Sequence, residues 1–260
     1  LALRKGETFE GQIVINFEVA EEDFGPEDLF IDYHGLGIKD LKINGTDVDP
    51  SKAFTGQRIY LDRTLLTLGG ANKVSLTFKS KYRKDGTACH HFKDTADDNE
   101  YLYTQFEAFN CHRVFPCFDQ PDLRAVMSLK TLAPSDWLVI SNGMEQANLS
   151  KNDAKFAQAL KDLDSGLADR YSEDFKIQLY NDTPEIAPYL YAFVAGPYDY
   201  VEYYKNIPGR SDPLRMRLYY RKSLKKDVDR VKEYMIDPVV KGIHWYSEFF
   251  GYNYPYEKYD

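Results

Sequence analysis

The sequence contains few cysteines and no long apolar run, and its first residues show no secretory signal pattern. Three cysteines, Cys89, Cys111 and Cys117, stand in 260 residues. They cannot all pair with one another and their spacing fits no zinc signature, so we expect a reducing compartment and a cytoplasmic location. No apolar run approaches the roughly 18 residues that span a bilayer, and the first residues lack a secretory signal pattern. We therefore expect no membrane segment in this chain.

The sequence also has fewer basic than acidic residues. The formal net charge is −8, with 41 acidic and 33 basic residues, and the basic side chains form no stripe along any segment. Nucleic acid is therefore not an expected partner. Acidic residues gather at 21–28 and 94–100, a pattern typical of solvated loops. Three Asn-x-Ser/Thr sequons, at Asn44, Asn148 and Asn181, leave a secreted or membrane-anchored parent protein open.

The sequence is rich in β-strand patterns. Residues 8–19 and 73–82 alternate apolar and polar side chains, and residues 38–45 end in an Asn-Gly turn. A period of two punctuated by Gly, Asn and Asp indicates antiparallel sheet. Further strands are predicted at 100–107, 125–134, 137–144, 175–180, 189–204 and 214–221. Residues 153–172 form either a helix or an excursion between strands. The predicted fold class is mostly β, as a β-sandwich or a large curved sheet.

The pattern changes after residue 204. Ser223 is predicted to cap a long amphipathic helix over residues 224–250, and Gly251 to end it. Its apolar positions are Leu224, Val228, Val231, Met235, Val239, Ile243 and Tyr246 or Phe250. Pro238 lies inside the helix and is expected to kink it, because proline lacks the backbone donor and crowds the preceding turn. Such a helix needs a layer to cover, so we expect it to open a second domain of a longer protein.

Motifs for catalysis are missing. A gluzincin zinc site needs two histidines one helical turn apart with a glutamate beside the first, because that spacing points both imidazoles at one metal. None of the five histidines has this context. His244 with Glu248 is more simply a helix-surface pair, and His90 with His91 a loop pair. A Gly-x-Ser-x-Gly elbow and a glycine-rich phosphate loop are absent too. We expect no catalytic residue and no metal ligand in this chain.

One stretch, "YTQFEAFNCHRVFPCFDQPD", collects polar side chains of several kinds. In a strand running through its first five residues, Gln105 and Glu107 share one face and Phe106 lies on the other. A carboxylate and an amide at the end of a strand could bind an ammonium group. The alternative is an ordinary exposed strand face.

The second half of this stretch also has an ordinary structural interpretation. It could form a corner fixed by proline, in which Arg113 pairs with Asp119. Cys111 and Cys117 are interpreted as packing residues in preference to metal ligands.

With these residues in view, the segment 101–143 closely resembles a segment of the aminopeptidase N family of zinc metallopeptidases. The likeness rests on Gln-x-Glu, then an arginine, then Phe-Pro-Cys-Phe-Asp and a proline, in that order. Residues 86–107 and 183–202 are similar to neighbouring parts of the family, and residues 250–260 to the segment ahead of its Gly-Ala-Met-Glu-Asn motif. This sequence departs from the family where Cys111 and His112 replace the usual alanine and arginine.

The resemblance implies a fold and a function. Residues 1–203 would form a saddle-like antiparallel β-sandwich that caps the active site, and residues 204–260 the first strand and long helix of a truncated thermolysin-like catalytic domain. Glu107 would bind the substrate's α-ammonium together with a second glutamate beyond this chain, and Gln105 would line the pocket for the first side chain. The expected partners are peptides with a free amino terminus and the missing catalytic and carboxy-terminal domains.

The implied activity is that of a zinc aminopeptidase that removes amino-terminal residues from peptides. Zinc would belong to the full-length parent, and this chain alone is expected to bind none and to be inactive. Two alternatives stay open. One is a non-catalytic scaffold or binding relative of the same fold, and the other is the epoxide-hydrolase branch, which resembles a version with glutamine in place of Glu107.

Overall fold

The computed structural model describes residues 1–20, 29–161 and 174–260. The chain forms two compact units, each described by itself below. Unit 1 comprises Leu1–Phe92, Leu102–Ser135 and Val139–Val194, and unit 2 comprises Lys93–Tyr101, Asp136–Leu138 and Ala195–Asp260. The predicted acidic loop at 21–28, and the second half of segment 153–172, lie outside the described residues. The domain division after residue 203 stays a prediction.

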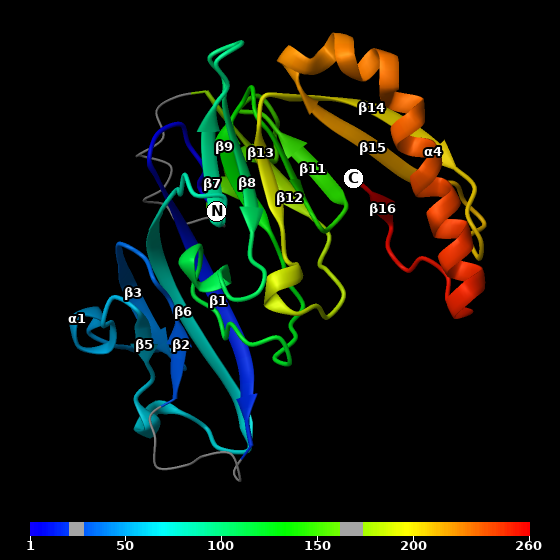
Figure 1. Ribbon diagram of the computed structural model, residues 1–260. Helices are drawn as coiled ribbons and strands as arrows, with labels where there is room; N and C mark the ends of the chain where they lie inside the picture. Colours follow the sequence, from blue (N-terminus) through cyan, green and yellow to red (C-terminus); the bar gives the residue numbers. More distant parts are fainter. Residues whose placement is uncertain (21–28, 162–173) are drawn as a thin grey trace. The chain divides into compact units, whose positions relative to one another are not determined.

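An antiparallel sheet of four strands in unit 1 follows the order β1-β6-β3-β4 (Figure 1). Its strands are β1 (Thr8–Val19), β6 (Gly70–Lys81), β3 (Gly37–Ile43) and β4 (Thr46–Asp47). The strands β1 and β6 pair along their whole length, from Thr8 with Lys81 to Val19 with Gly70. The predicted Asn-Gly turn joins β3 to β4, with positive φ angles of 48° at Asn44 and 85° at Gly45. Two positive φ angles suit this dipeptide, which explains the tight hairpin.

Three further sheets involve strands of unit 1. Their orders are β10-β13-β8-β7, β11-β12-β9 and β2-β5. The strands are β2 (Phe30–Asp32), β5 (Arg58–Tyr60), β7 (Ala88–Lys93), β8 (Glu100–Gln105), β9 (Lys130–Pro134), β10 (Leu138–Ser141), β11 (Glu145–Leu149), β12 (Phe175–Tyr180) and β13 (Phe193–Gly196). The described residues of unit 1 also include two short helices, α1 (Pro50–Ala53) and α2 (Phe156–Lys161), and α2 lies within the segment that was predicted as helix or excursion.

The core of unit 1 is built from the inward faces of these strands. One cluster joins Leu132, Phe156, Phe175 and Ile177, which are all buried. Removing a side chain of this size from water stabilises a fold by about 1.5–3 kcal/mol. A buried tyrosine, Tyr33, satisfies its hydroxyl inside the core by donating to the Lys79 carbonyl at 2.6 Å. The strands β9 and β12 are buried along nearly their whole length, so this cluster lies deep in unit 1.

In unit 2, two long strands and one long helix pack together (Figure 1). The strand β14 (Tyr198–Lys205) pairs antiparallel with β15 (Leu214–Arg221), and the short β16 (Lys258–Tyr259) pairs parallel with β15. The helix α4 (Lys225–Phe250) contributes Ile243 to a buried cluster with Ile207, Leu214 and Met216.

The helix α4 confirms the predicted span but not the predicted cap. A 3₁₀ turn (Lys222–Leu224) precedes it, and Leu224 occupies the cap position without a side-chain hydrogen bond. The Ser223 hydroxyl instead donates to Asp94 Oδ2 at 2.7 Å, so the capping prediction was wrong. The helix continues through Pro238, and its axis changes direction along its length in Figure 1. Gly251 ends the helix with φ 60°, as predicted.

The apolar stripe predicted on α4 is only partly buried. Val228, Ile236 and Ile243 are buried, at 8%, 5% and 8% exposure. Val231 and Met235, which were predicted to share that face, are 41% and 48% exposed. The helix therefore carries a substantial apolar surface that unit 2 itself leaves uncovered.

The prediction of a mostly β fold with antiparallel sheets, followed by a strand and a long helix, is confirmed. Over the described parts of the chain, no helix has both the length and the apolar character needed to cross a bilayer.

Candidate substrate-binding site

Gln105 and Glu107 stand where β8 ends. The strand's last residue is Gln105, so it is two residues shorter than predicted, and Glu107 begins a turn. Both side chains are exposed, while Phe106 between them is 1% exposed. The Phe106 ring meets the Phe115 ring edge to face at 6.0 Å between centroids. A buried aromatic anchor thus presents two polar neighbours to solvent.

The turn after Phe106 is held through its backbone by Asn110. The Asn110 amide donates to the Phe106 carbonyl at 2.9 Å, and its side-chain amide donates to the Glu107 carbonyl at 3.2 Å. The peptide bond between Glu107 and Ala108 is cis. Among the described residues, the side chains of Gln105 and Glu107 have no hydrogen-bond or ion-pair partner. The Glu107 carboxylate is therefore available to a cation from outside.

The corner that follows contains a buried contact between His112 and Asp119 that differs from the predicted pairing. His112 Nδ1 lies 2.7 Å from Asp119 Oδ2, and the same oxygen accepts the His112 backbone amide at 3.0 Å. Asp119 is 2% exposed. Arg113, predicted as the partner of Asp119, has a buried Nε with no hydrogen-bond partner in the described part of the chain. The predicted pairing was wrong because the 3₁₀ turn (Cys111–Arg113) points His112, not Arg113, at the carboxylate.

The same corner brings two cysteines together. The Sγ atoms of Cys111 and Cys117 and a carboxylate oxygen of Asp119 lie within 4.8 Å of one another, and all three residues are buried. Burial raises the pKa of both thiols, that of Cys117 well above its ordinary value. Both thiols are therefore protonated near neutral pH, which is unfavourable for a metal ligand.

The histidines do not meet the requirements of a catalytic zinc site. His90 and His91 lie in the strand β7, not in the predicted loop. His90 Nδ1 accepts the Gly86 amide at 2.9 Å, and the His91 ring stacks on Tyr82. His244 makes its hydrogen bond to the Asn206 carbonyl and not along its own helix. Among the described residues, no histidine pair shares a helix face beside a glutamate.

A charged cluster in unit 2 was missed by the sequence analysis. Asp94 Oδ2 accepts the Ser223 hydroxyl at 2.7 Å and an Arg221 guanidinium N–H at 2.9 Å. The Ala96 amide, then the Ser223 hydroxyl and the Arg221 charge, lower the pKa of Asp94 below its ordinary value. The residues around Asp94 had been interpreted as a solvated acidic loop. Its partners lie more than a hundred positions away, so no local pattern could have revealed them.

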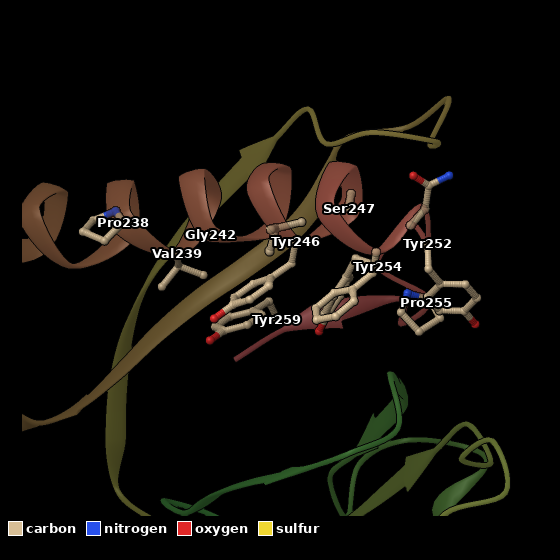
Figure 2. A pocket seen from close by; sticks show the side chains of 12 residues that line it. Pro238, Val239, Gly242, Tyr246, Ser247, Tyr252, Tyr254, Pro255 and Tyr259 are labelled. Carbon is tan, nitrogen blue, oxygen red and sulfur yellow. The ribbon is translucent and has the colours of Figure 1, made fainter.

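A pocket lies beneath α4 in unit 2. This pocket measures about 630 Å³ and extends from Pro238 along the helix to the segment before β16. Figure 2 shows the side chains of Tyr246, Tyr254 and Tyr259 gathered beneath the helix. Its lining residues include no carboxylate, imidazole or thiol. The pocket is apolar and has no group that could hold a metal or activate water.

The sequence of the chain is similar to a known protein family. The sequence matches the Peptidase M1 N-terminal domain over residues 2–161. Aminopeptidase N of Streptomyces lividans is 31% identical over 257 residues, covering 99% of this chain and 26% of that protein. Aminopeptidase M1 of Arabidopsis thaliana is 24% identical over 267 residues, covering 97% and 26%. Probable M1 family aminopeptidase 1 of Encephalitozoon cuniculi (strain GB-M1) is 25% identical over 251 residues, covering 95% and 25%.

The chain belongs to the Peptidase M1 N-terminal domain family. The resemblance found in the sequence is thereby confirmed. The chain spans about a quarter of the length of these relatives.

Proposed function

We propose that this chain is the amino-terminal part of a zinc-dependent aminopeptidase and that Glu107 binds the α-ammonium of a peptide substrate. The observation that carries the proposal is the exposed carboxylate of Glu107, which has no partner among the described residues and follows a strand anchored by Phe106. Family membership and the aminopeptidase relatives support it.

The selectivity of an exopeptidase gives this carboxylate its role. An enzyme that removes amino-terminal residues must recognise a free, charged amino group and refuse an acylated, neutral one. A carboxylate that becomes desolvated when substrate binds favours the cation and leaves an unpaired charge when the amine is blocked. A second glutamate from the longer protein, as the resemblance implies, would strengthen this discrimination. Gln105, exposed beside Glu107, would line the pocket for the first side chain.

The described residues do not fit a catalytic zinc ion. The described histidines do not form a pair one helical turn apart beside a glutamate, and the cluster of Cys111, Cys117 and Asp119 is buried with protonated thiols. Zinc, and the activation of water that it supplies, belong in this proposal to the part of the longer protein outside this chain. This chain contributes binding, orientation and the covering of the active site.

The apolar surface of α4 supports the same proposal. Trp245, Phe249 and Phe250 are 55%, 66% and 66% exposed, and the pocket of Figure 2 lies on this helix. Exposed apolar surface of this extent indicates a packing partner. We assign it to further domains of the same protein, because the aminopeptidase relatives are about four times as long as this chain.

The test is Glu107→Gln in the full-length protein, which keeps the shape of the side chain and removes its charge. A charged hydrogen bond contributes about 1.5–3 kcal/mol, so catalytic efficiency toward free-amino peptides should fall roughly tenfold to several hundredfold. The matched control is Glu185→Gln, another exposed glutamate of unit 1, which should change nothing. Unchanged efficiency in Glu107→Gln, with zinc still bound, would refute the ammonium-binding role.

The same assay separates the alternatives. A scaffold relative would show no aminopeptidase activity in the unsubstituted full-length protein. An epoxide hydrolase would convert an epoxide substrate. Glu107 favours the aminopeptidase over both, because a scaffold has no need of an ammonium-binding carboxylate and the epoxide-hydrolase branch resembles a version with glutamine at this position.

A further inference from the structure

Two buried thiols meet inside the corner that follows Glu107. Cys111 and Cys117 are 0% and 7% exposed, and their sulfur atoms lie within 4.8 Å of each other. The sequence analysis treated both as packing residues, and the proposed function uses neither. Two thiols at this separation need only a small side-chain movement to reach bonding distance.

The backbone holds the two cysteines in this arrangement from both sides. The amides of Val114 and Phe115 donate to the Cys111 carbonyl at 2.9 and 3.2 Å, which folds the chain back on itself. Cys117 exchanges two backbone hydrogen bonds with Asp32, at 3.0 and 3.1 Å.

A second anchor ties the Cys111 side of the corner to the same neighbouring segment. The amide of His34, two residues beyond Asp32, donates to the His112 carbonyl at 2.9 Å. Both ends of the corner are therefore attached to one segment. The backbone positions of the two cysteines are therefore held close together by the fold.

We propose that Cys111 and Cys117 form a reversible disulfide by exchange with a small-molecule disulfide such as oxidised glutathione. The thiolate of Cys117, the more exposed of the two, attacks the small disulfide and releases one thiolate from it. The thiolate of Cys111 then attacks the Cys117 sulfur and releases the second. The two protons lost by the cysteines end on the two small thiols, so two cysteines are oxidised and one small disulfide is reduced.

The surroundings of the pair determine its rate. Beside the thiols stand the carboxylates of Asp119 and Asp32, with the His112 imidazole against Asp119. Burial, then the neighbouring Cys111 thiol, and then these negative charges raise the pKa of Cys117. The attacking thiolate is scarce at neutral pH, so closure should be slow there and accelerate with rising pH by up to about tenfold per unit.

The third cysteine provides an internal control. Cys89 is 0% exposed in the strand β7, and it does not belong to the cluster formed by Cys111, Cys117 and Asp119. Burial raises the pKa of its thiol as well. It therefore resembles Cys111 in burial and differs in lacking the neighbouring sulfur, so its behaviour separates the effect of proximity from that of burial.

The sequence makes the disulfide easy to detect. Trypsin cuts after Lys84, Lys93, Arg113 and Arg124, which places each cysteine in its own peptide. The native full-length protein is incubated with oxidised glutathione at mildly alkaline pH, and free thiols are then alkylated in denaturant. Tryptic digestion without reduction follows, and the peptides are identified by mass spectrometry. A disulfide joins residues 94–113 to residues 114–124, and a reducing agent separates them.

We expect the linked peptide to become the main form of both cysteines, while the Cys89 peptide carries the alkyl group. In Cys111→Ala and in Cys117→Ala the linked peptide should be lost, and in Cys89→Ala it should be unchanged. The proposal is overturned if Cys111 and Cys117 are recovered alkylated after the incubation. It is also overturned if the two cysteines remain as mixed disulfides with glutathione and form no bond to each other. A third contradicting result is that Cys111 or Cys117 forms a disulfide with Cys89 as often as the two form one with each other. The comparison of wild type with Cys89→Ala remains decisive if a corner variant fails to fold.

Discussion

The imidazole of His112 and the carboxylate of Asp119 meet at 2.7 Å inside the corner that follows β8. The same carboxylate oxygen also accepts the backbone amide of His112, so one side chain holds both the position and the ring of the other. His112 is 9% exposed and Asp119 2%. In this arrangement, the loss of either partner leaves the other buried with an unused hydrogen-bonding group.

The first prediction concerns Asp119→Asn. The amide side chain of asparagine has one acceptor oxygen in place of two and carries no charge. The free energy of unfolding should therefore fall by about 1–3 kcal/mol. The measurement is the midpoint of urea unfolding at neutral pH. Asp122→Asn, an exposed neighbour, serves as the control and should shift the midpoint little. Equal midpoints for both variants would mean that the pair contributes nothing to stability.

The second prediction concerns the pH dependence of Asp94. Its pKa is lowered in the folded chain by the Ala96 amide, the Ser223 hydroxyl and the Arg221 charge. Because the pKa of Asp94 is lower in the folded chain than the ordinary value of 3.8, its ionised carboxylate stabilises the fold. This contribution is fully present at pH values above 3.8 and is lost as the pH falls through the pKa of the folded chain. The difference in unfolding midpoint between wild type and Asp94→Asn should therefore be largest near neutral pH and shrink below about pH 4.

The control for Asp94 is Asp212→Asn, an exposed aspartate of unit 2. Its midpoint should follow that of wild type across the whole pH range. If the difference in unfolding midpoint between wild type and Asp94→Asn stayed constant from pH 7 to acid pH, the charge of Asp94 would not be the source of its contribution to stability.

The third prediction separates Gln105 from Glu107 in the full-length protein. Glu107 is proposed to bind a group that every peptide substrate shares, whereas Gln105 is proposed to contact the first side chain. Gln105→Ala should therefore change the ranking of substrates that differ in their first residue. The catalytic efficiency toward any one substrate should change by about tenfold or less, because the loss of a neutral contact costs about 0.5–1.5 kcal/mol. The kinetic constants of a panel of aminoacyl substrates test this. A uniform loss across the panel would assign Gln105 to the ammonium instead.

The fourth prediction is that this chain, produced alone, holds no stoichiometric zinc and hydrolyses no aminoacyl substrate. The reason is that its described histidines do not form the pair that a catalytic zinc needs, and its clustered thiols are protonated. Metal analysis after dialysis, together with an aminoacyl hydrolysis assay, provides the measurement. One tightly held zinc per chain would contradict it.

Local patterns predicted most of the regular structure, and they did so where alternation was strong. The spans 8–19, 175–180 and 214–221 coincide with β1, β12 and β15, because the alternation of apolar and polar residue types is a local property of the sequence, even though the polar positions of β12 are buried as well. The helix α4 was found within one residue for the same reason. His90 and His91 were predicted to lie in a loop because two adjacent polar imidazoles interrupt the alternating pattern of the strand β7.

The contacts of the candidate site were harder to predict. The exposure of Gln105 and Glu107 around a buried Phe106 follows from alternation. The choice of His112 over Arg113 as partner of Asp119 depends on how a 3₁₀ turn directs consecutive side chains, which composition does not encode. The contacts of Asp94 with Arg221 and Ser223 join residues far apart in the chain, so only the folded arrangement reveals them.

Phe106 stands between the two proposed substrate-binding residues and is itself almost completely buried. In a scan of all single substitutions, the effects on activity and on cellular abundance should therefore differ among the three consecutive positions 105, 106 and 107. Changes at Glu107 should lower activity while the protein remains abundant, and changes at Gln105 should be tolerated more broadly. Changes at Phe106 should lower both, because the ring that orients its neighbours also packs against Phe115. Selection on this short segment would then preserve an aromatic residue that no substrate touches as strictly as the carboxylate beside it.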